Sequence, residues 1–485
     1  MSTLLSLRSM TTSFLIFASL QAGFAFSQEA SSETKPPAQA TTTNTVETST
    51  AAPADPQTQQ IKAIRELINR GKVEEAFAKL DEAIQGEKPE VPFLALRAEL
   101  FAKTGRVQES IKEFTRAVEL EPNNAEYLNS RGFVKMSTDE LVGAEEDFTK
   151  AIELNPKLAK SYNNRGMIKV AQKDFLMAVN DFNEALLIDN NYVDAYNNRG
   201  FAYWELGNFA EAIKNFNESI KRDPGYYNAY NNRGLALIKR GELEKAIEDF
   251  SKAIELAPLL PKHYLHRSMA YEQLGKKDLA MADRQKIAWL EELQSLRAQL
   301  RAHPDNVTLQ AELARHYLKQ ELTVEAAELA AKLKDADNTK IVGMLLEAEI
   351  AVIQNKPEEA IKIANAILEL EANQDLAVSL RGSAHLMLGH LDEAIADFEK
   401  SLRFDQEVAK AYWERAKKLD EAGKKPEAEA DRQRARLLDP TLPGAKPPEK
   451  KPEMKPVDDK VDEAFGTPAE PKKEESAAPP KTDGP

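Results

Sequence analysis

The sequence has no cysteine among its 485 residues and only six histidines. The absence of cysteine excludes disulfide bonds, thiolate metal ligands and cysteine nucleophiles. His263 and His266 lie three positions apart, but no cysteine or third ligand accompanies them. His385 and His390 lie on either side of Gly389, at a spacing that is poor for metal ligands. The sequence therefore predicts neither a metal site nor a cofactor.

Positive charge is in deficit, because 79 acidic residues face 65 lysines and arginines and give a net charge of −14. Proteins that bind nucleic acid usually carry a basic stripe, so no nucleic-acid partner is predicted. Both common glycine-rich phosphate loops are missing as well. Carboxylates are frequent, but none is set in an apolar stretch that would raise its pKa. We find no catalytic constellation and predict that the protein is not an enzyme.

Long apolar runs are missing except near the N-terminus, where residues 13–26 form a stretch of about 14 residues. This stretch is too short to span a membrane, and with Arg8 before it and Ser27 after it the pattern is typical of a signal peptide. We predict a signal peptide over residues 1–27, no membrane span, and a periplasmic or secreted protein that begins near Gln28. An uncleaved anchor is the alternative, whereas a lipoprotein is excluded because no cysteine follows.

Two segments lack the apolar residues that a core needs. Residues 28–56 are rich in Thr, Ala, Pro, Ser and Gln, and residues 443–485 are rich in Pro, Lys, Glu and Ala. Such compositions predict a disordered leader and a disordered tail. Val457, Val461 and Phe465 interrupt the tail and leave a short docking motif as an alternative for that stretch.

Between these segments the apolar residues follow a helical period, most clearly over residues 193–226. Gly207 breaks the pattern in the middle, which predicts a hairpin of two short antiparallel helices. Gly200 and Ala212 are small, so we expect the two helices to approach closely there, with Phe216 filling the space beside the contact. One such hairpin cannot bury its own apolar face and predicts neighbours of the same kind.

The neighbours are present as repeats of 34 residues. Three residue types keep this period: an Arg-Gly pair at 131–132, 165–166, 199–200 and 233–234; a small residue at Ser110, Ala144, Ala178, Ala212, Ala246 and Ala280; and an aromatic at Phe114, Phe148, Phe182, Phe216 and Phe250. Proline closes most units. This pattern resembles the tetratricopeptide repeat family. The resemblance implies an all-α fold, a right-handed α-solenoid of about eleven helix hairpins.

The register divides these hairpins into two arrays. Seven units begin at residues 57, 91, 125, 159, 193, 227 and 261, and four begin 12 residues out of phase at 307, 341, 375 and 409. We therefore predict one array over 57–303 and a second over 304–442. The last unit of each array carries arginine at the aromatic position, Arg284 and Arg432, which predicts a soluble cap at each end.

The last helix of the first array is expected to be long, from 278 to 302. Trp289, Leu293, Leu296 and Leu300 recur along it at heptad-like steps. Such a seam packs either inside the protein or against a second copy in a homodimer, and the sequence alone leaves both alternatives open.

The resemblance also implies a binding surface, because in this family the first helix of each unit lines a concave groove. The groove positions hold two polar rows, Asn129, Asn163, Asn197 and Asn231 beside Ser130, Asn164, Asn198 and Asn232, and an apolar row, Phe133, Met167, Phe201 and Leu235, with Trp204 next to it. Amides offer a donor and an acceptor to the main chain of an extended peptide, and the apolar row suits its side chains. We therefore expect the asparagines to be exposed to a ligand. Two alternatives would also explain why asparagine recurs: hydrogen bonds between neighbouring helices, or duplication of the repeat without selection for binding.

A subset of the family clamps the C-terminal carboxylate of chaperone tails. Lys160, Asn164 and Asn198 match that clamp, whereas Asn228 and Asn232 stand where it has basic residues, so the clamp is incomplete. The resemblance thus implies a non-enzymatic scaffold or adaptor that binds extended segments of protein partners, with envelope assembly as one setting. A substrate-recruiting or regulatory subunit of an enzyme complex is the alternative.

Overall fold

The computed structural model describes residues 56–85 and 90–444, and the regular elements in these ranges are 22 helices. They pair into antiparallel hairpins, which confirms the predicted all-α solenoid of tetratricopeptide type. The first seven hairpins are α2 (Pro56–Asn69) with α3 (Val73–Ile84), α4 (Val91–Lys103) with α5 (Val107–Leu120), α6 (Ala125–Met136) with α7 (Leu141–Leu154), α8 (Ala159–Ala171) with α9 (Phe175–Ile188), α10 (Val193–Glu205) with α11 (Phe209–Arg222), α12 (Tyr227–Lys239) with α13 (Leu243–Leu256), and α14 (Pro261–Gln273) with α15 (Lys277–Ala302).

The last four hairpins are α16 (Val307–Leu318) with α17 (Thr323–Lys334), α18 (Lys340–Ile353) with α19 (Pro357–Leu370), α20 (Asp375–Met387) with α21 (Leu391–Lys400), and α22 (Gln406–Glu421) with α23 (Lys425–Leu438). The described part of the chain forms two compact units, and the dividing point between residues 294 and 295 lies within α15. The predicted boundary between residues 303 and 304 stays a prediction.

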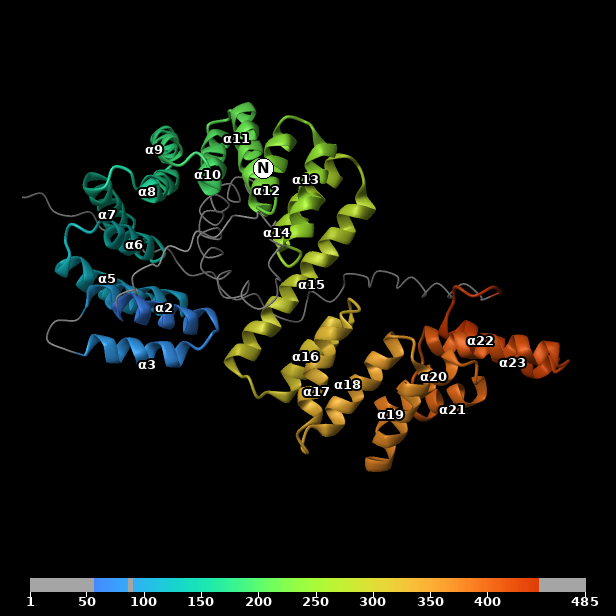
Figure 1. Cartoon of the computed structure of the whole chain (residues 1–485). Coiled ribbons are helices and arrows are strands. Elements are labelled where there is room, and N and C mark those ends of the chain that lie inside the picture. The colour runs from blue at the N-terminus through green and yellow to red at the C-terminus, as the bar shows by residue number, and fades with distance from the viewer. Residues whose placement is uncertain (1–55, 86–89, 445–485) are drawn as a thin grey trace, which may run out of the picture. The chain divides into compact units, whose positions relative to one another are not determined.

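In the first unit the hairpins follow one another in chain order along a curve (Figure 1). Each second helix packs on its own first helix and on the first helix of the next hairpin. The first helices also contact one another directly, α6 with α8, α8 with α10, α10 with α12 and α12 with α14. Because these contacts join every other helix in the chain order, the first helices form one continuous surface of the stack.

In six of the described hairpins the core is built around a repeated phenylalanine. Phe148, Phe182, Phe216 and Phe250 are fully buried. The repeated glycine makes room for this ring: a Cβ atom on Gly200 would lie 2.6 Å from the ring of Phe216. The small size of Gly200 was expected to serve its contact with Ala212. The structure adds that the ring of Phe216 supplies the atoms nearest to Gly200.

The turn between the two helices of a hairpin needs a left-handed backbone. Gly207 supplies it with a φ of 75°, and glycine adopts this conformation at little cost because it has no Cβ atom. Lys173 occupies the same place in the preceding hairpin with a φ of 64°. The turn is therefore set by the packing of the two helices, and glycine eases it without being required.

An arginine of the first helix ties it to the second helix in most hairpins. Arg233 donates from Nε and Nη2 to the two carboxylate oxygens of Asp249, at 2.8 and 2.6 Å. The same link, 16 residues apart in sequence, joins Arg131 to Asp147, Arg165 to Asp181, Arg267 to Asp283, Arg381 to Asp397 and Arg415 to Asp431. Paired, charge-assisted bonds of this geometry fix the angle between the two helices.

The two predicted cap arginines share one geometry. Arg284 pairs with Glu272 and Arg432 pairs with Asp420, in both cases a carboxylate 12 residues earlier in the chain. The side chain of Arg284 is 62% exposed, in contrast to the buried phenylalanines at the same place in the hairpins before it. At Arg284 the substitution thus replaces a buried ring by a solvated ion pair.

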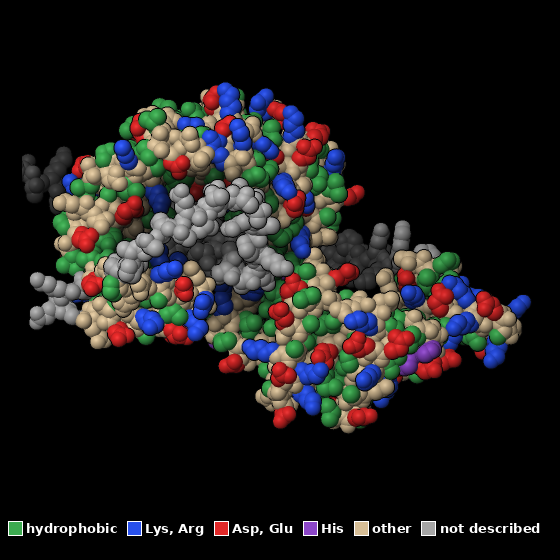
Figure 2. Space-filling view, viewed as in Figure 1, with side chains coloured by type: hydrophobic (Ala, Val, Ile, Leu, Met, Phe, Trp, Pro, Cys, Tyr) green, Lys and Arg blue, Asp and Glu red, His purple; other side chains and the backbone are tan. Residues whose placement is uncertain are grey.

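Three of the four residues of the heptad-like seam on α15 are buried within the single chain, and Leu300 is half-buried. Trp289, Leu293 and Leu296 are 7%, 2% and 8% exposed. This burial favours packing inside the protein over a homodimer contact, because little of the seam remains for a second copy. On the face shown in Figure 2, acidic and basic side chains are interspersed over the helices.

The predicted signal peptide lies outside the described residues, and so do nearly all of the predicted leader and tail. Within the described part of the chain, none of the helices combines the length and the apolar character that a membrane span requires.

Candidate functional site

The asparagines of the first unit form hydrogen bonds from one hairpin to the next. The side-chain nitrogen of one asparagine donates to the side-chain oxygen of another in the preceding hairpin. The three bonds of this kind join Asn164 to Asn129 at 3.2 Å, Asn198 to Asn163 at 3.0 Å and Asn232 to Asn197 at 2.9 Å. They link α6, α8, α10 and α12 side chain to side chain.

Longer bonds inside each helix connect these links into one chain. Asn163 donates to Asn164 and Asn197 donates to Asn198, both at 3.4 Å, and Asn231 donates to Asn232 at 3.2 Å. Followed from donor to acceptor, the six bonds form one chain that leads from Asn231 on α12 to Asn129 on α6. We call this run of seven amides, Asn129, Asn163, Asn164, Asn197, Asn198, Asn231 and Asn232, the amide ladder. Hydrogen bonds in such a chain polarise one another and strengthen together.

Side chains other than asparagine close both ends of the amide ladder. At one end the hydroxyl of Ser161 donates to Asn129 at 3.0 Å. At the other end the Nδ1 atoms of His263 and His266 lie 3.1 and 2.7 Å from the side-chain oxygen of Asn231. Since that oxygen is an acceptor, each Nδ1 carries a proton. Burial, with Lys262 nearby, lowers the pKa of His263 to about 3 and that of His266 to about 4, so both rings are neutral.

The structure corrects the expectation that the asparagines are exposed. Asn129, Asn163, Asn164, Asn197 and Asn231 are buried, whereas Ser130, Asn198 and Asn232 are half-buried. Ser130 takes no part in the ladder bonds described here. A side-chain amide has two N–H donors and two acceptor lone pairs, and the ladder engages one donor of Asn198 and one of Asn232. These two half-buried amides therefore keep hydrogen-bonding capacity for a ligand.

The apolar row lies on the same helices, one turn further along. Phe133 is 38% exposed, and Met167, Phe201 and Leu235 are half-buried. The indole ring of Trp204 stacks on Phe201, with centroids 6.0 Å apart and planes at 15°. The indole N–H is buried and has no hydrogen-bond partner among the described residues. Partial exposure of large apolar side chains in successive helices is the feature expected of a surface that receives a ligand.

Comparison with known proteins agrees with the repeat pattern. The tetratricopeptide repeat family matches residues 61–125, 197–261 and 345–409, and the related TPR repeat matches residues 166–207. The matched residues are tetratricopeptide repeats (TPRs). No curated protein matches the sequence.

Solved TPR structures resemble parts of the chain. MamA is 26% identical and covers 33% of this chain and 93% of its own, with a TM-score of 0.30. YrrB, a TPR protein with an unusual peptide-binding site, is 20% identical and covers 40% of this chain and 95% of its own, with a TM-score of 0.31. PilW, a type IV pilus biogenesis factor, is 20% identical and covers 46% of this chain and 98% of its own, with a TM-score of 0.38.

The last TPR of the first unit has a histidine, His266, in place of one polar-row residue, and it also carries a half-buried lysine, Lys262. Lys262 donates to the side-chain oxygen of Asn228 at 3.0 Å, and burial lowers the pKa of Lys262 to about 8. The sequence places Asn228 where the carboxylate clamp has a basic residue. The structure shows that Asn228 instead holds the lysine of the following TPR, a pairing that sequence spacing did not reveal.

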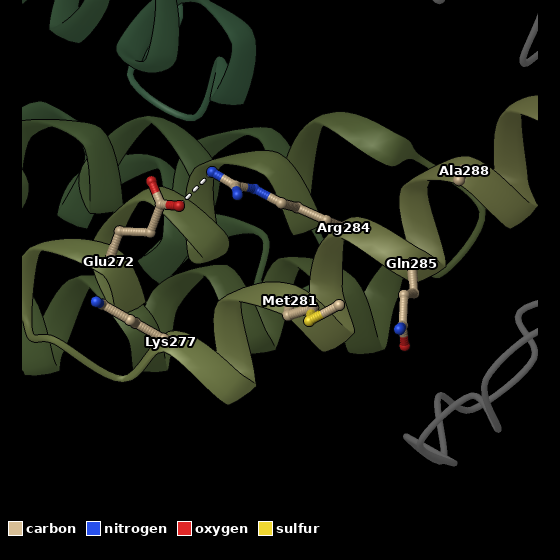
Figure 3. A pocket seen from close by; sticks show the side chains of 6 residues that line it. All are labelled: Glu272, Lys277, Met281, Arg284, Gln285 and Ala288. Atoms are coloured by element: carbon tan, nitrogen blue, oxygen red, sulfur yellow. Dashed lines mark hydrogen bonds and ion pairs between the residues drawn. The ribbon is translucent and has the colours of Figure 1, made fainter. Parts of the chain in front are cut away.

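A cavity lies apart from the amide ladder, between α14 and α15 (Figure 3). It measures ≈ 640 Å³ and is lined by Glu272, Lys277, Met281, Arg284, Gln285 and Ala288. Glu272 and Arg284 point toward each other and pair across it. In the preceding TPR, Ile238 and Ile247 pack in a core cluster with Ala270 of the next first helix. The cavity therefore lies at the last TPR of the first unit, where such a core cluster with a following first helix is replaced by an open space.

The histidines of the second unit come closer than their spacing suggested. The Nδ1 atoms of His385 and His390 lie 3.4 Å apart. Within the described residues, no cluster of three or more potential metal ligands surrounds them or occurs elsewhere.

Proposed function

We propose that this TPR protein is a non-enzymatic scaffold that binds extended segments of partner proteins on the first helices of its first unit. The observation that carries this proposal is the repetition of one surface in four successive TPRs, on α6, α8, α10 and α12. Each of these helices contributes polar residues to the polar rows and, one turn further along, a large apolar residue to the apolar row. A surface repeated along a stack suits a ligand that is itself repetitive, and the main chain of an extended peptide is such a ligand.

The polar rows bind the main chain of the ligand, and the apolar row binds its side chains. The half-buried amides of Asn198 and Asn232 can donate their second N–H to peptide carbonyls, and each such bond contributes about 0.5–1.5 kcal/mol. Phe133, Met167, Phe201 and Leu235 receive apolar side chains. The ladder holds the amides in place before a ligand arrives, so little side-chain entropy is lost on binding.

The proposal places the protein outside the cytoplasm. It is supported by the positively charged start, the short apolar stretch and the small residues that follow it in positions 1–27. Envelope assembly is one process that needs such a scaffold.

Partner capture tests the scaffold. Wild-type protein, the double variant Phe201→Ala with Leu235→Ala, and the control Leu187→Ala are each used as bait in an extract of the native host. Leu187 lies on α9, a second helix, and is 80% exposed, so its removal tests an apolar side chain away from the groove. We expect specific partners to bind wild type and the control and to be lost from the double variant.

Calorimetry with the captured partner then measures affinity, after circular dichroism has shown that the double variant is folded. Equal capture by all three baits would contradict binding on the first helices. The nature of the partner also separates a scaffold from a regulatory or substrate-recruiting subunit, because the latter must capture a catalytic chain.

A further inference from the structure

The amide ladder sets the distance at which the binding surface repeats. Asn198 on α10 reaches Asn163 on α8 with a direct bond of 3.0 Å, and Asn232 on α12 reaches Asn197 on α10 at 2.9 Å. Helices in direct contact lie about 8–10 Å apart. The polar and apolar rows therefore present the same pair of groups roughly every 9 Å along the stack.

This distance discriminates between the extended conformations of a peptide. A β-strand turns the same face to a surface every second residue, or about every 6.6–6.8 Å. Successive equivalent side chains of a strand would drift out of register with the TPRs after one or two units. A polyproline II helix has three residues per turn and rises 3.1 Å per residue, so it repeats its face about every 9.3 Å. This repeat lies within the range of about 8–10 Å expected for helices in direct contact.

The chemistry of the two rows fits the same conformation. A polyproline II helix has no internal hydrogen bonds, so its carbonyl groups remain available to accept from the amides of Asn198 and Asn232. The stacked rings of Phe201 and Trp204 resemble the aromatic-lined grooves that receive such helices.

We propose that the ligand of this surface is a polyproline II segment with an apolar side chain at every third residue. This inference rests on the proposed function and adds the conformation and the period of the ligand. Phe133, Met167, Phe201 and Leu235 lie on four successive first helices and would receive four such side chains. Three steps of about 9.3 Å correspond to nine residues, so the bound segment spans about ten residues.

Three synthetic peptides test the period. All have the same length and the same composition of leucine, proline and serine, and they carry four leucines at every second, every third or every fourth position. Titration calorimetry measures their affinity for the full chain. We expect the peptide of period three to bind at least about tenfold more tightly than the other two. Its affinity should fall in the Phe201→Ala, Leu235→Ala double variant and should persist in Leu187→Ala.

A fourth peptide tests the conformation. It keeps leucine at every third residue but replaces proline by glycine, which removes the preference for polyproline II. We expect weaker binding, because the flexible peptide must be ordered on binding. Equal or tighter binding of the glycine peptide would overturn the conformational part of the inference.

The failures of the two proposals are distinguishable. Tighter binding at period two or four that still depends on Phe201 and Leu235 would overturn the period and leave the scaffold intact. No binding by any peptide, while captured partners still require the same two residues, would overturn this inference alone. No binding by any peptide and no loss of partners from the double variant would overturn both.

Discussion

The guanidinium of Arg199 donates from Nε to the side-chain oxygen of Asn215, 2.7 Å away. Eight described hairpins carry an arginine at this place, and the other seven pair it with a carboxylate. Arg199 instead bonds two neutral amides, Asn215 and Asn183. Burial lowers its pKa, whereas the bond to Asp249 raises the pKa of the equivalent Arg233. The hairpin of α10 and α11 therefore lacks one stabilising charge.

Asn215→Asp should stabilise this hairpin, because it gives Arg199 the two charge-assisted bonds that its neighbours have. The gain is expected to be about 0.5–2 kcal/mol, since charged hydrogen bonds contribute more than neutral ones and partial exposure reduces the benefit. Thermal and urea unfolding of the full chain measure it. Aspartate cannot donate the hydrogen bond that Asn215 makes to the carbonyl of Glu211. The loss of this bond offsets part of the gain and accounts for the lower end of the range.

The matched control is the reverse change one TPR later. Asp249→Asn removes the carboxylate from Arg233 and should destabilise the chain by a similar amount. A melting temperature that falls in Asn215→Asp, or does not change in Asp249→Asn, would show that these links carry no stability.

Gly200→Ala should destabilise the same hairpin by about 1–3 kcal/mol, because its Cβ atom would lie 2.6 Å from the ring of Phe216. Chemical unfolding measures the cost. Gly143→Ala is the control, since the added Cβ would meet only the flexible Lys135 side chain at 3.4 Å, and helix propensity favours alanine. Phe216→Leu in the Gly200→Ala background should recover part of the loss. An unchanged Gly200→Ala variant would contradict the role assigned to the ring.

Much of the fold could be predicted because each hairpin depends on local signals that recur. Gly207 and Phe216 indicate the turn and the core of one TPR, and the period of 34 residues indicates its neighbours. The cap residues could also be predicted, because Arg284 stands where five earlier units have phenylalanine and Arg432 stands one unit after Phe398. These signals need no knowledge of distant contacts.

The site was predicted less completely, because its bonds join residues about 35 positions apart, as in the link from Asn232 to Asn197. That link depends on the offset between two helices, which the sequence does not contain. The spacing of His263 and His266 did not connect them with the binding surface, although they stand where earlier TPRs have Ala or Ser and Asn. A comparison of each unit with the next, position by position, would have revealed them as the end of the asparagine rows.

Acid should destabilise the first unit through His263 and His266. Their pKa values in the fold, about 3 and about 4, lie below the value of 6.5 for a free histidine. Between pH 6.5 and 4 the unfolded chain binds more protons than the folded chain, so stability falls as the pH falls through this window. At about pH 5 the loss amounts to about 2 kcal/mol for each histidine. Urea unfolding at about pH 7 and about pH 5 measures it.

The control for this pH effect comes from the repeats themselves. The double variant His263→Ser with His266→Asn carries the residues that stand at the same places earlier in the stack, Ser161 and Asn164. It should keep its stability at neutral pH and lose the part of the pH dependence due to histidine. The same difference between neutral and acidic pH in both proteins would refute the contribution of these two residues.

Export should remove the start of the chain. In the native host the mature protein is expected to begin near Gln28, because the apolar stretch at 13–26 ends in small residues suited to a signal peptidase. N-terminal sequencing and cell fractionation check this. As a control, Ile16→Arg in the apolar stretch should retain the uncleaved protein inside the cell. Recovery of protein that still begins with Met1 would contradict both cleavage and the proposed location.

The triple variant Asn164→Ala, Asn198→Ala, Asn232→Ala should lower stability. It removes the three bonds between first helices and leaves the buried oxygens of Asn129, Asn163 and Asn197 without these donors. Each lost bond costs about 0.5–1.5 kcal/mol, and a buried acceptor without a partner adds to that cost. Alanine returns about 0.5 kcal/mol per site through its helix propensity. The expected net loss is therefore about 1–4 kcal/mol, measured by calorimetric melting.

A single exposed asparagine on a second helix provides the comparison. Asn180→Ala on α9 should leave the melting temperature unchanged or raise it slightly, because helix propensity is then the main effect. If the triple variant melts like Asn180→Ala, the ladder contributes nothing to folding, and the repeated geometry of its bonds would have to serve binding alone. If it melts lower and also loses affinity for the period-three peptide at temperatures where it remains folded, the same amides both hold the TPRs together and present the groove.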